Sequence, residues 1–205
     1  IAWRVGTLSL QFVPPAEGGG MEIIMPSIYL SPSVQEYNEY ITGGSEEYYM
    51  NLIADAMVPY LRASGITFTR NNPNDTLSQV IAQSNAGDYG LHLALHSNAA
   101  PENMAGMLQG PDVYYYATSS EGQRAANLIA LNLKDIYPNP NLVAVIPNTT
   151  LAELRRTRAT AVLVEIAYHD NLEDANWITG NINLIARNLV LSVTEYFGIP
   201  FVEPS

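Results

Sequence analysis

The most constraining feature of this sequence is the regular alternation of short apolar runs with segments of helical periodicity between Ser27 and Phe197. Short runs separated by amphipathic helices predict strands of a parallel sheet covered by helices. The sequence therefore predicts an α/β fold, a three-layer sandwich with a twisted, largely parallel central sheet flanked by helices. Strands are expected at 28–30, 66–69, 91–95, 113–117 and 161–164, and helices at 46–64, 77–85, 121–136 and 183–197.

Residues 1–26 differ from this pattern and are expected to lie outside the main domain, which we place at 27–200. Alternating apolar residues from Leu8 to Phe12 are followed by Pro14 and Pro15, and a second apolar run precedes Pro26. This pattern is typical of a β-hairpin, but the tail of a preceding domain would have the same features. Because the sequence begins at Ile1, we also expect a longer chain with a removed leader and additional domains.

Composition excludes several classes of function. Apolar residues make up 47% of the chain and charged residues 14%, which favours a globular protein over a disordered one. The formal net charge of −11, with nine basic residues, argues against nucleic-acid binding, which needs clustered Lys and Arg. No apolar run reaches the roughly 20 residues that span a bilayer. Because cysteine is absent, any metal would have to be bound by His, Asp or Glu.

Three segments place a chemically versatile side chain at the end of an expected element. Glu46 and Glu47 open a helix after the N-cap candidate Ser45, His96 follows a strand, and Glu165 ends another. Glutamates in a first helical turn usually interact only with the helix dipole, and a histidine after a strand is often structural. Glu165 is more informative, because a carboxylate that ends an apolar strand is costly to bury unless it is paired.

In combination, these segments resemble the zinc-dependent N-acetylmuramoyl-L-alanine amidase family, the amidase type 3 cell-wall hydrolases. Members have a Glu that opens a helix with an Asn shortly after, a strand that ends in His-x-Asn-Ala, and a late strand that ends in Leu-x-Glu. The matching positions here are Glu47 with Asn51, the run from His96 to Ala99, and Leu163 to Glu165. The resemblance implies that Glu47 and His96 bind zinc and that Glu165 is the general base.

The chain departs from the family at the first zinc ligand. The family has Gly-His after its first strand, whereas this sequence has Pro32 at the histidine position, and proline cannot bind zinc. His92 is too distant to replace it, because four residues along a strand span about 13 Å. His169, which follows Glu165 by four residues, is the better candidate. A carboxylate such as Glu36, or no third ligand, remains an alternative.

The resemblance implies an enzyme that cleaves the amide bond between N-acetylmuramic acid and L-alanine in peptidoglycan, with zinc as the cofactor. Its partner would be peptidoglycan or a muropeptide, and its location would be extracellular or the cell wall. One alternative is an inactive module of the same fold that binds wall peptides or a protein partner, because Pro32 has removed a ligand. Another is a related metal-dependent peptidase or deacylase with a different amide substrate.

Overall fold

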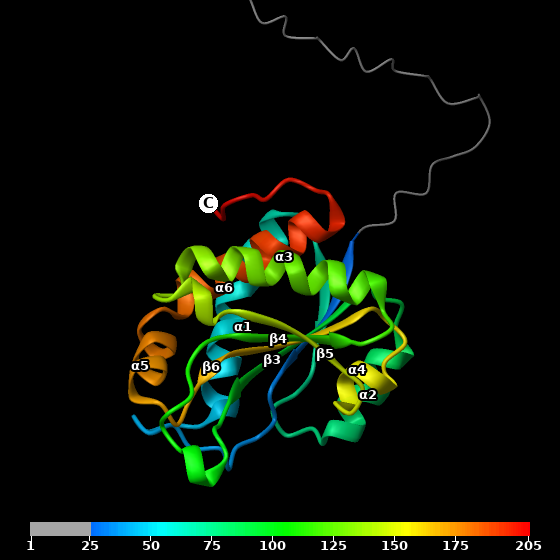
Figure 1. The fold of residues 1–205 in the computed structure, drawn as a ribbon. Helices are drawn as coiled ribbons and strands as arrows, with labels where there is room; N and C mark the ends of the chain where they lie inside the picture. Colours follow the sequence, from blue (N-terminus) through cyan, green and yellow to red (C-terminus); the bar gives the residue numbers. More distant parts are fainter. Residues whose placement is uncertain (1–25) are drawn as a thin grey trace, which may run out of the picture.

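The computed structural model describes residues 26–205, and within them the strands form one six-stranded sheet in the order β2-β1-β3-β6-β4-β5 (Figure 1). The predicted hairpin or tail at residues 1–26 lies, apart from Pro26, outside the described residues. The strands are β1 (Ser27–Pro32), β2 (Thr67–Arg70), β3 (Leu91–Asn98), β4 (Asp112–Tyr116), β5 (Ala144–Asn148) and β6 (Ala161–Tyr168).

Strand direction divides the sheet into two parts. Strands β2, β1, β3 and β6 are parallel to one another. At the other edge, β4 and β5 are parallel to each other, but β4 runs antiparallel to β6. The expected α/β sandwich with a largely parallel sheet is therefore confirmed, and two edge strands are reversed.

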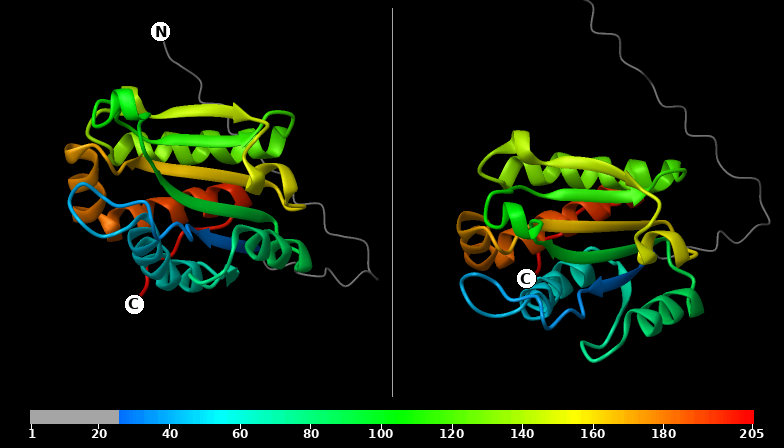
Figure 2. Two further views of the ribbon diagram at one scale, coloured as in Figure 1. Left: turned by 90° about the horizontal axis from the view of Figure 1, so that it is seen from below. Right: turned by 60° about the horizontal axis from the view of Figure 1, so that its bottom comes forward.

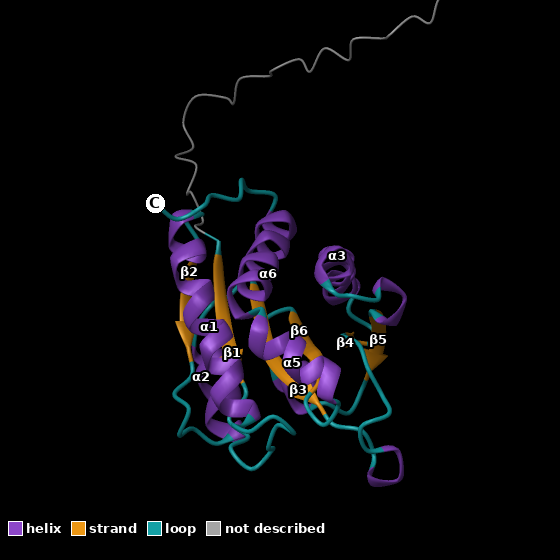
Figure 3. Cartoon of the chain, turned by 90° about the vertical axis from the view of Figure 1, so that its left-hand side faces the viewer, coloured by secondary structure: helices purple, strands orange, loops and turns teal. Residues whose placement is uncertain are grey.

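Helices cover both faces of this sheet. On one face, α6 (Ile182–Phe197) packs against both α1 (Glu46–Ala63) and α3 (Ser120–Ile136), and Figure 3 shows the three helices in a row. On the opposite face, α2 (Leu77–Ala86) lies beside the short α4 (Ala152–Arg156), and Asn85 of α2 donates a hydrogen bond to the carbonyl of Arg156 (Figure 2). The remaining helices are α5 (Leu172–Gly180) and the 3-10 turns η1 (Glu102–Met104) and η2 (Pro140–Leu142).

The pleat of the two central strands separates the core from the polar side chains. Successive residues of a strand point to opposite faces of the sheet. One face of β3 and β6 contributes buried apolar side chains to the core beneath α1, α3 and α6, namely Leu91, Leu93, Leu95, Val162 and Val164. The residues between them point to the face that α2 and α4 cover, and these include His92, Ala94, His96, Leu163 and Glu165.

The central strands extend further than the sequence predicts. β3 continues to Asn98 and β6 to Tyr168, so His96 and Glu165 lie inside strands rather than at their ends. A polar residue on one face of a sheet does not interrupt the backbone hydrogen bonds, so it does not end a strand. The sequence analysis also missed β5, α4 and α5, which are short elements of five to nine residues.

Candidate functional site

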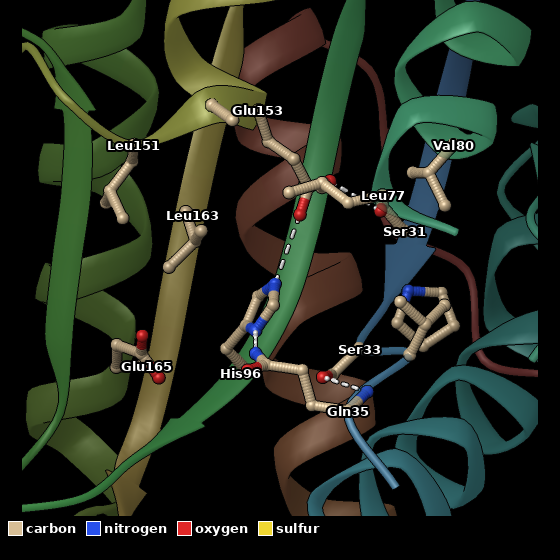
Figure 4. Close-up of a pocket in the computed structure, with 13 residues that line it drawn as sticks. Ser31, Ser33, Gln35, Leu77, Val80, His96, Leu151, Glu153, Leu163 and Glu165 are labelled. Carbon is tan, nitrogen blue, oxygen red and sulfur yellow. Dashed lines mark hydrogen bonds and ion pairs between the residues drawn. The ribbon is translucent and has the colours of Figure 1, made fainter. Parts of the chain in front are cut away.

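A pocket lies on the face of the sheet that α2 and α4 cover, over the carboxyl-terminal halves of β3 and β6 (Figure 4). Its walls combine apolar side chains with a small group of polar ones, as is usual for small-molecule sites. The apolar wall comes from α2, from the start of α4 and from β6, and includes Leu77, Val80, Leu151 and Leu163. The polar part is formed by Ser31, Ser33, Gln35, His96, Glu153 and Glu165.

His96 lies at the centre of the polar group, between two carboxylates. Its Nδ1 is 2.8 Å from Oε1 of Glu46, and its Nε2 is 3.1 Å from Oε1 of Glu153. The imidazole is 12% exposed, and both carboxylates are almost fully buried. Because ionised carboxylates only accept hydrogen bonds, a proton on each ring nitrogen satisfies both contacts.

The pKa shifts of the three groups agree with a positively charged His96 between two ionised glutamates. Burial lowers the pKa of His96, but hydrogen bonds to Glu153 and Glu46 outweigh this and raise the pKa well above its usual value. Burial likewise opposes ionisation of the two glutamates. Contacts with His96 nevertheless lower the pKa of Glu46, and contacts with His92 and His96 lower the pKa of Glu153.

Glu46 is held at the first position of α1. The hydroxyl of Ser45 caps this helix by accepting a hydrogen bond from the backbone N–H of Tyr48. The other oxygen of Glu46, Oε2, accepts a hydrogen bond of 2.6 Å from the side-chain amide of Asn38. The helix start therefore fixes the carboxylate, and Asn38 leaves Oε1 free to face His96.

Glu165 lies beside His96 on the neighbouring strand. The two residues are register partners of β3 and β6, so their side chains leave the same face of the sheet. Oε2 of Glu165 is buried and has no hydrogen-bond partner. Burial, together with the charges of Glu46, Asp112 and Glu153, raises the pKa of Glu165 to about 7, although His96 opposes this shift. Glu165 can therefore exchange a proton near neutral pH.

Glu47 does not face His96. Its carboxylate accepts a hydrogen bond of 3.2 Å from the amide of Asn51, one turn further along α1. Consecutive helical residues point about 100° apart, so only one of the two glutamates can face His96. The structure brings Glu46 into contact with His96, and the role of Glu47 as a metal ligand stays a prediction.

His169 lies outside the pocket lining. It is 4% exposed, stacks on the ring of Tyr40, and donates a hydrogen bond of 2.9 Å from Nδ1 to the carbonyl of Ser97. Glu36, the alternative ligand, is exposed in the loop after β1. Within residues 26–205, no three His, Cys, Asp or Glu side chains form a group that could hold a metal ion.

The side-chain amide of Gln35 lies beside the contact between His96 and Glu46. The amide nitrogen of Gln35 is 3.2 Å from Nδ1 of His96 and 3.4 Å from Oε1 of Glu46. A glutamine amide can turn its oxygen instead of its nitrogen toward this contact. The donor set for a divalent metal would then be one imidazole, one carboxylate and one amide oxygen, once Nδ1 has released its proton.

Two residues of this site were missed by the sequence analysis. Glu153 was missed because the short helix α4 was not predicted, although a single Glu beside Leu151 and Leu154 is an interrupted apolar pattern that could have indicated it. Gln35 was missed because amide side chains were not considered as metal ligands. Glu46 was named together with Glu47 as a glutamate in the first turn of a helix, but it was not named as a site residue.

Comparisons with known proteins agree with the fold. The family model described as N-acetylmuramoyl-L-alanine amidase matches residues 35–195. A comparison with curated proteins gave no match.

Among solved structures, the amidase AmiC2 of Nostoc punctiforme aligns with a TM-score of 0.73 and 16% identity, over 84% of this chain and 97% of that one. The catalytic domain of the CD27L endolysin, which targets Clostridia difficile, aligns with a TM-score of 0.68 and 23% identity, over 83% of this chain and 97% of that one. The catalytic domain of CwlV from Bacillus (Paenibacillus) polymyxa aligns with a TM-score of 0.72 and 16% identity, over 86% of this chain and 100% of that one. At these identities, the structural matches support the fold.

Proposed function

Because this chain belongs to the N-acetylmuramoyl-L-alanine amidase family, we propose that its pocket hydrolyses the amide bond between N-acetylmuramic acid and L-alanine in peptidoglycan. The observation that carries this proposal is Glu165, a carboxylate with one buried, unpartnered oxygen and a pKa of about 7 beside His96. A general base for hydrolysis near neutral pH needs these properties.

Glu165 acts in both proton transfers of this proposal. As the carboxylate, it takes a proton from the attacking water. It then returns the proton to the nitrogen of the leaving L-alanine, whose departure as an amine requires protonation. The apolar wall of Leu77, Val80, Leu151 and Leu163 excludes bulk water from this step and contacts the apolar parts of the substrate.

We propose that Glu46, His96 and Gln35 hold the zinc ion of the family at this pocket. When bound, zinc supplies a Lewis acid that polarises the amide carbonyl and acidifies water. Glu46 replaces Glu47 in this assignment because its carboxylate faces His96. His169 is not part of the proposed ligand set, because its ring contacts Ser97 and Tyr40 instead of His96 and Glu46.

The test is product analysis on defined muropeptides with the protein and its Glu165→Gln variant. We expect the protein to release the peptide from N-acetylmuramic acid, and the variant to lose about 10²–10⁴-fold in rate while it stays folded. Elemental analysis should give one zinc per chain. Release of a different fragment would assign the pocket to another amide, and a fully active variant would remove Glu165 from the mechanism.

A second candidate is a metal-free module that binds wall peptides or a protein partner. The observation that favours it is that protons alone can satisfy His96, since both ring nitrogens face carboxylates. Binding of muropeptides without turnover, unchanged by EDTA and without zinc in the protein, would select this candidate. Zinc-dependent turnover would eliminate it.

We propose that the protein acts outside the cell or at the cell wall, where its substrate is found. No helix among the described residues is long and apolar enough to span a membrane. The substrate itself would be the main partner, and additional domains of a longer chain would provide any attachment to the wall. Fractionation of producing cells, followed by detection of the full chain, would test the location.

A further inference from the structure

Glu153 connects the pocket to a buried network that includes the second histidine of β3. Its Oε1 faces Nε2 of His96 at 3.1 Å, and its Oε2 is 2.8 Å from Nε2 of His92. Ser31 also donates a hydrogen bond of 2.6 Å to Oε2. His92 and His96 are four residues apart on one face of β3, and a single carboxylate joins their rings.

Away from His96, this network is almost fully shielded from water. Glu153 is 4% exposed and His92 is fully buried. At its far end, the hydroxyl of Ser84 is 2.9 Å from Nδ1 of His92. A buried carboxylate is costly unless its oxygens are satisfied, and here both oxygens have partners.

The direction of these hydrogen bonds follows from the chemistry of the partners. An ionised carboxylate only accepts, so Ser31, His92 and His96 must all donate to Glu153. Nε2 of His96 therefore carries a proton toward Glu153, and Nδ1 is the nitrogen that faces Glu46. The hydrogen-bond partner of one ring nitrogen fixes the role of the other.

The local backbone keeps Glu153 in place. The side-chain oxygen of Asn148, at the end of β5, accepts hydrogen bonds from the backbone N–H groups of Thr150 and Leu151 and so fixes the turn into α4. At the other end, the hydroxyl of Thr157 donates to the carbonyl of Glu153. Leu154, the next residue, is buried in the small apolar cluster on this face of the sheet.

We propose that Glu153 is a positioning residue of the active site, which accepts a hydrogen bond from Nε2 of His96 and thereby turns Nδ1 of His96 toward Glu46 and Gln35. This inference rests on the proposed function for what Nδ1 then does, namely bind the metal beside Glu46. Carboxylates that orient metal-binding histidines in this way typically change metal affinity about 10- to 100-fold when they are mutated.

The experiment compares the full chain with Glu153→Gln and with Ser84→Ala, in two measurements. Calorimetry with zinc chloride on metal-free protein gives the affinity, and two-bond ¹H–¹⁵N correlation spectra give the protonation of each His96 nitrogen. Ser84→Ala is the matched control, because it removes a buried hydrogen bond of the same network without touching His96. Circular dichroism verifies that each variant is folded.

We expect the spectra of the unmodified protein to show a proton on Nε2 of His96. Glu153→Gln should weaken zinc binding about 10- to 100-fold, and Ser84→Ala should change it by less than about threefold, the spread of small local effects. Equal zinc affinity in the protein and Glu153→Gln, or His96 with an unprotonated Nε2, would overturn the positioning role.

The spectra keep this test independent of the metal assignment and of the folding of the variant. If the unmodified protein binds no zinc, the metal part of the proposed function fails. The proton on Nε2 and its disturbance in Glu153→Gln would then still support the positioning role. If Glu153→Gln does not fold, an unprotonated Nε2 of His96 in the unmodified protein would still overturn the positioning role of Glu153.

Discussion

At the scale of single residues, Glu165 gives the clearest pH dependence. The folded protein raises the pKa of this carboxyl from 4.5 to about 7, chiefly through burial. A general base must be ionised, so hydrolysis should increase with pH. A bound zinc ion would lower this pKa, so the rate should level off with a midpoint at or below about 7. Initial rates on a muropeptide between pH 5 and 9 would measure this midpoint. A rate that falls as the pH rises from 5 to 7 would show that Glu165 is not the group that limits the rate.

The same shift has a thermodynamic consequence with a defined sign. Because the folded pKa is raised, the contribution of Glu165 to stability is fully present below about pH 4.5 and is lost as pH rises through about 7. The Glu165→Gln variant has no carboxyl group at this position, so it does not lose this stability as the pH rises. In EDTA, the melting temperature of Glu165→Gln relative to the unmodified protein should therefore be higher at pH 8 than at pH 4.5. An equal difference at both pH values would contradict the shift.

The adjacent glutamates Glu46 and Glu47 offer a matched pair of variants. Glu46 contacts His96, whereas Glu47 contacts Asn51. We expect Glu46→Gln to weaken zinc binding by at least about 10- to 100-fold, the loss typical of an outer partner alone. Glu47→Gln should stay within about twofold, as surface substitutions usually do. Calorimetry measures the zinc affinity of both variants. A larger loss in Glu47→Gln than in Glu46→Gln would instead support Glu47 as the zinc ligand, as predicted from the sequence.

Sequence reasoning could not separate these two glutamates, because the choice depends on the rotation of α1 about its axis. It also could not find Glu153, whose importance comes from residues 57 and 61 positions away in the chain. By contrast, His96 and Glu165 were identified because their positions in apolar strands are visible in the sequence. A polar residue in an apolar strand is a local signal, and a partner across the pocket is not.

At the scale of elements, the longest helices and the core strands were predicted because their periodicity extends over many residues. Helices α1 and α3 begin at serine N-caps and run for 18 and 17 residues. The missed elements β5, α4 and α5 are short, and α4 has no side-chain cap hydrogen bond. Tertiary contacts rather than local propensity decide such segments.

The cap of α1 can be tested for a role in the site. Ser45 caps α1 directly before Glu46, and Ser119 caps α3 by the same kind of contact without lining the pocket. Replacement of either serine by alanine should cost about 1 kcal/mol of stability. Only Ser45→Ala should also weaken zinc binding, because it loosens the turn that holds Glu46. Urea unfolding and calorimetry give the two quantities. Equal zinc affinities would show that Asn38 alone positions Glu46.

At the scale of the whole molecule, the fold was more predictable than the site because the apolar pattern of the strands specifies layers, whereas the site depends on side chains from separate layers. His96 and Glu165 come from the sheet, Glu46 from a helix on one face and Glu153 from a helix on the other. The reversal of β4 and β5 was not predicted either, because strand periodicity does not encode direction.

The overall charge predicts how the protein responds to ionic strength on its proposed substrate. The chain carries a formal net charge of −11, so anionic polymers of a cell wall should repel it. The Debye length falls from about 30 Å at 0.01 M salt to about 8 Å at 0.15 M, which screens this repulsion. Initial rates on intact walls should therefore increase with salt over this range. Walls stripped of their anionic polymers are the control and should show a smaller increase. A rate that falls with salt on intact walls would indicate an attractive contact instead.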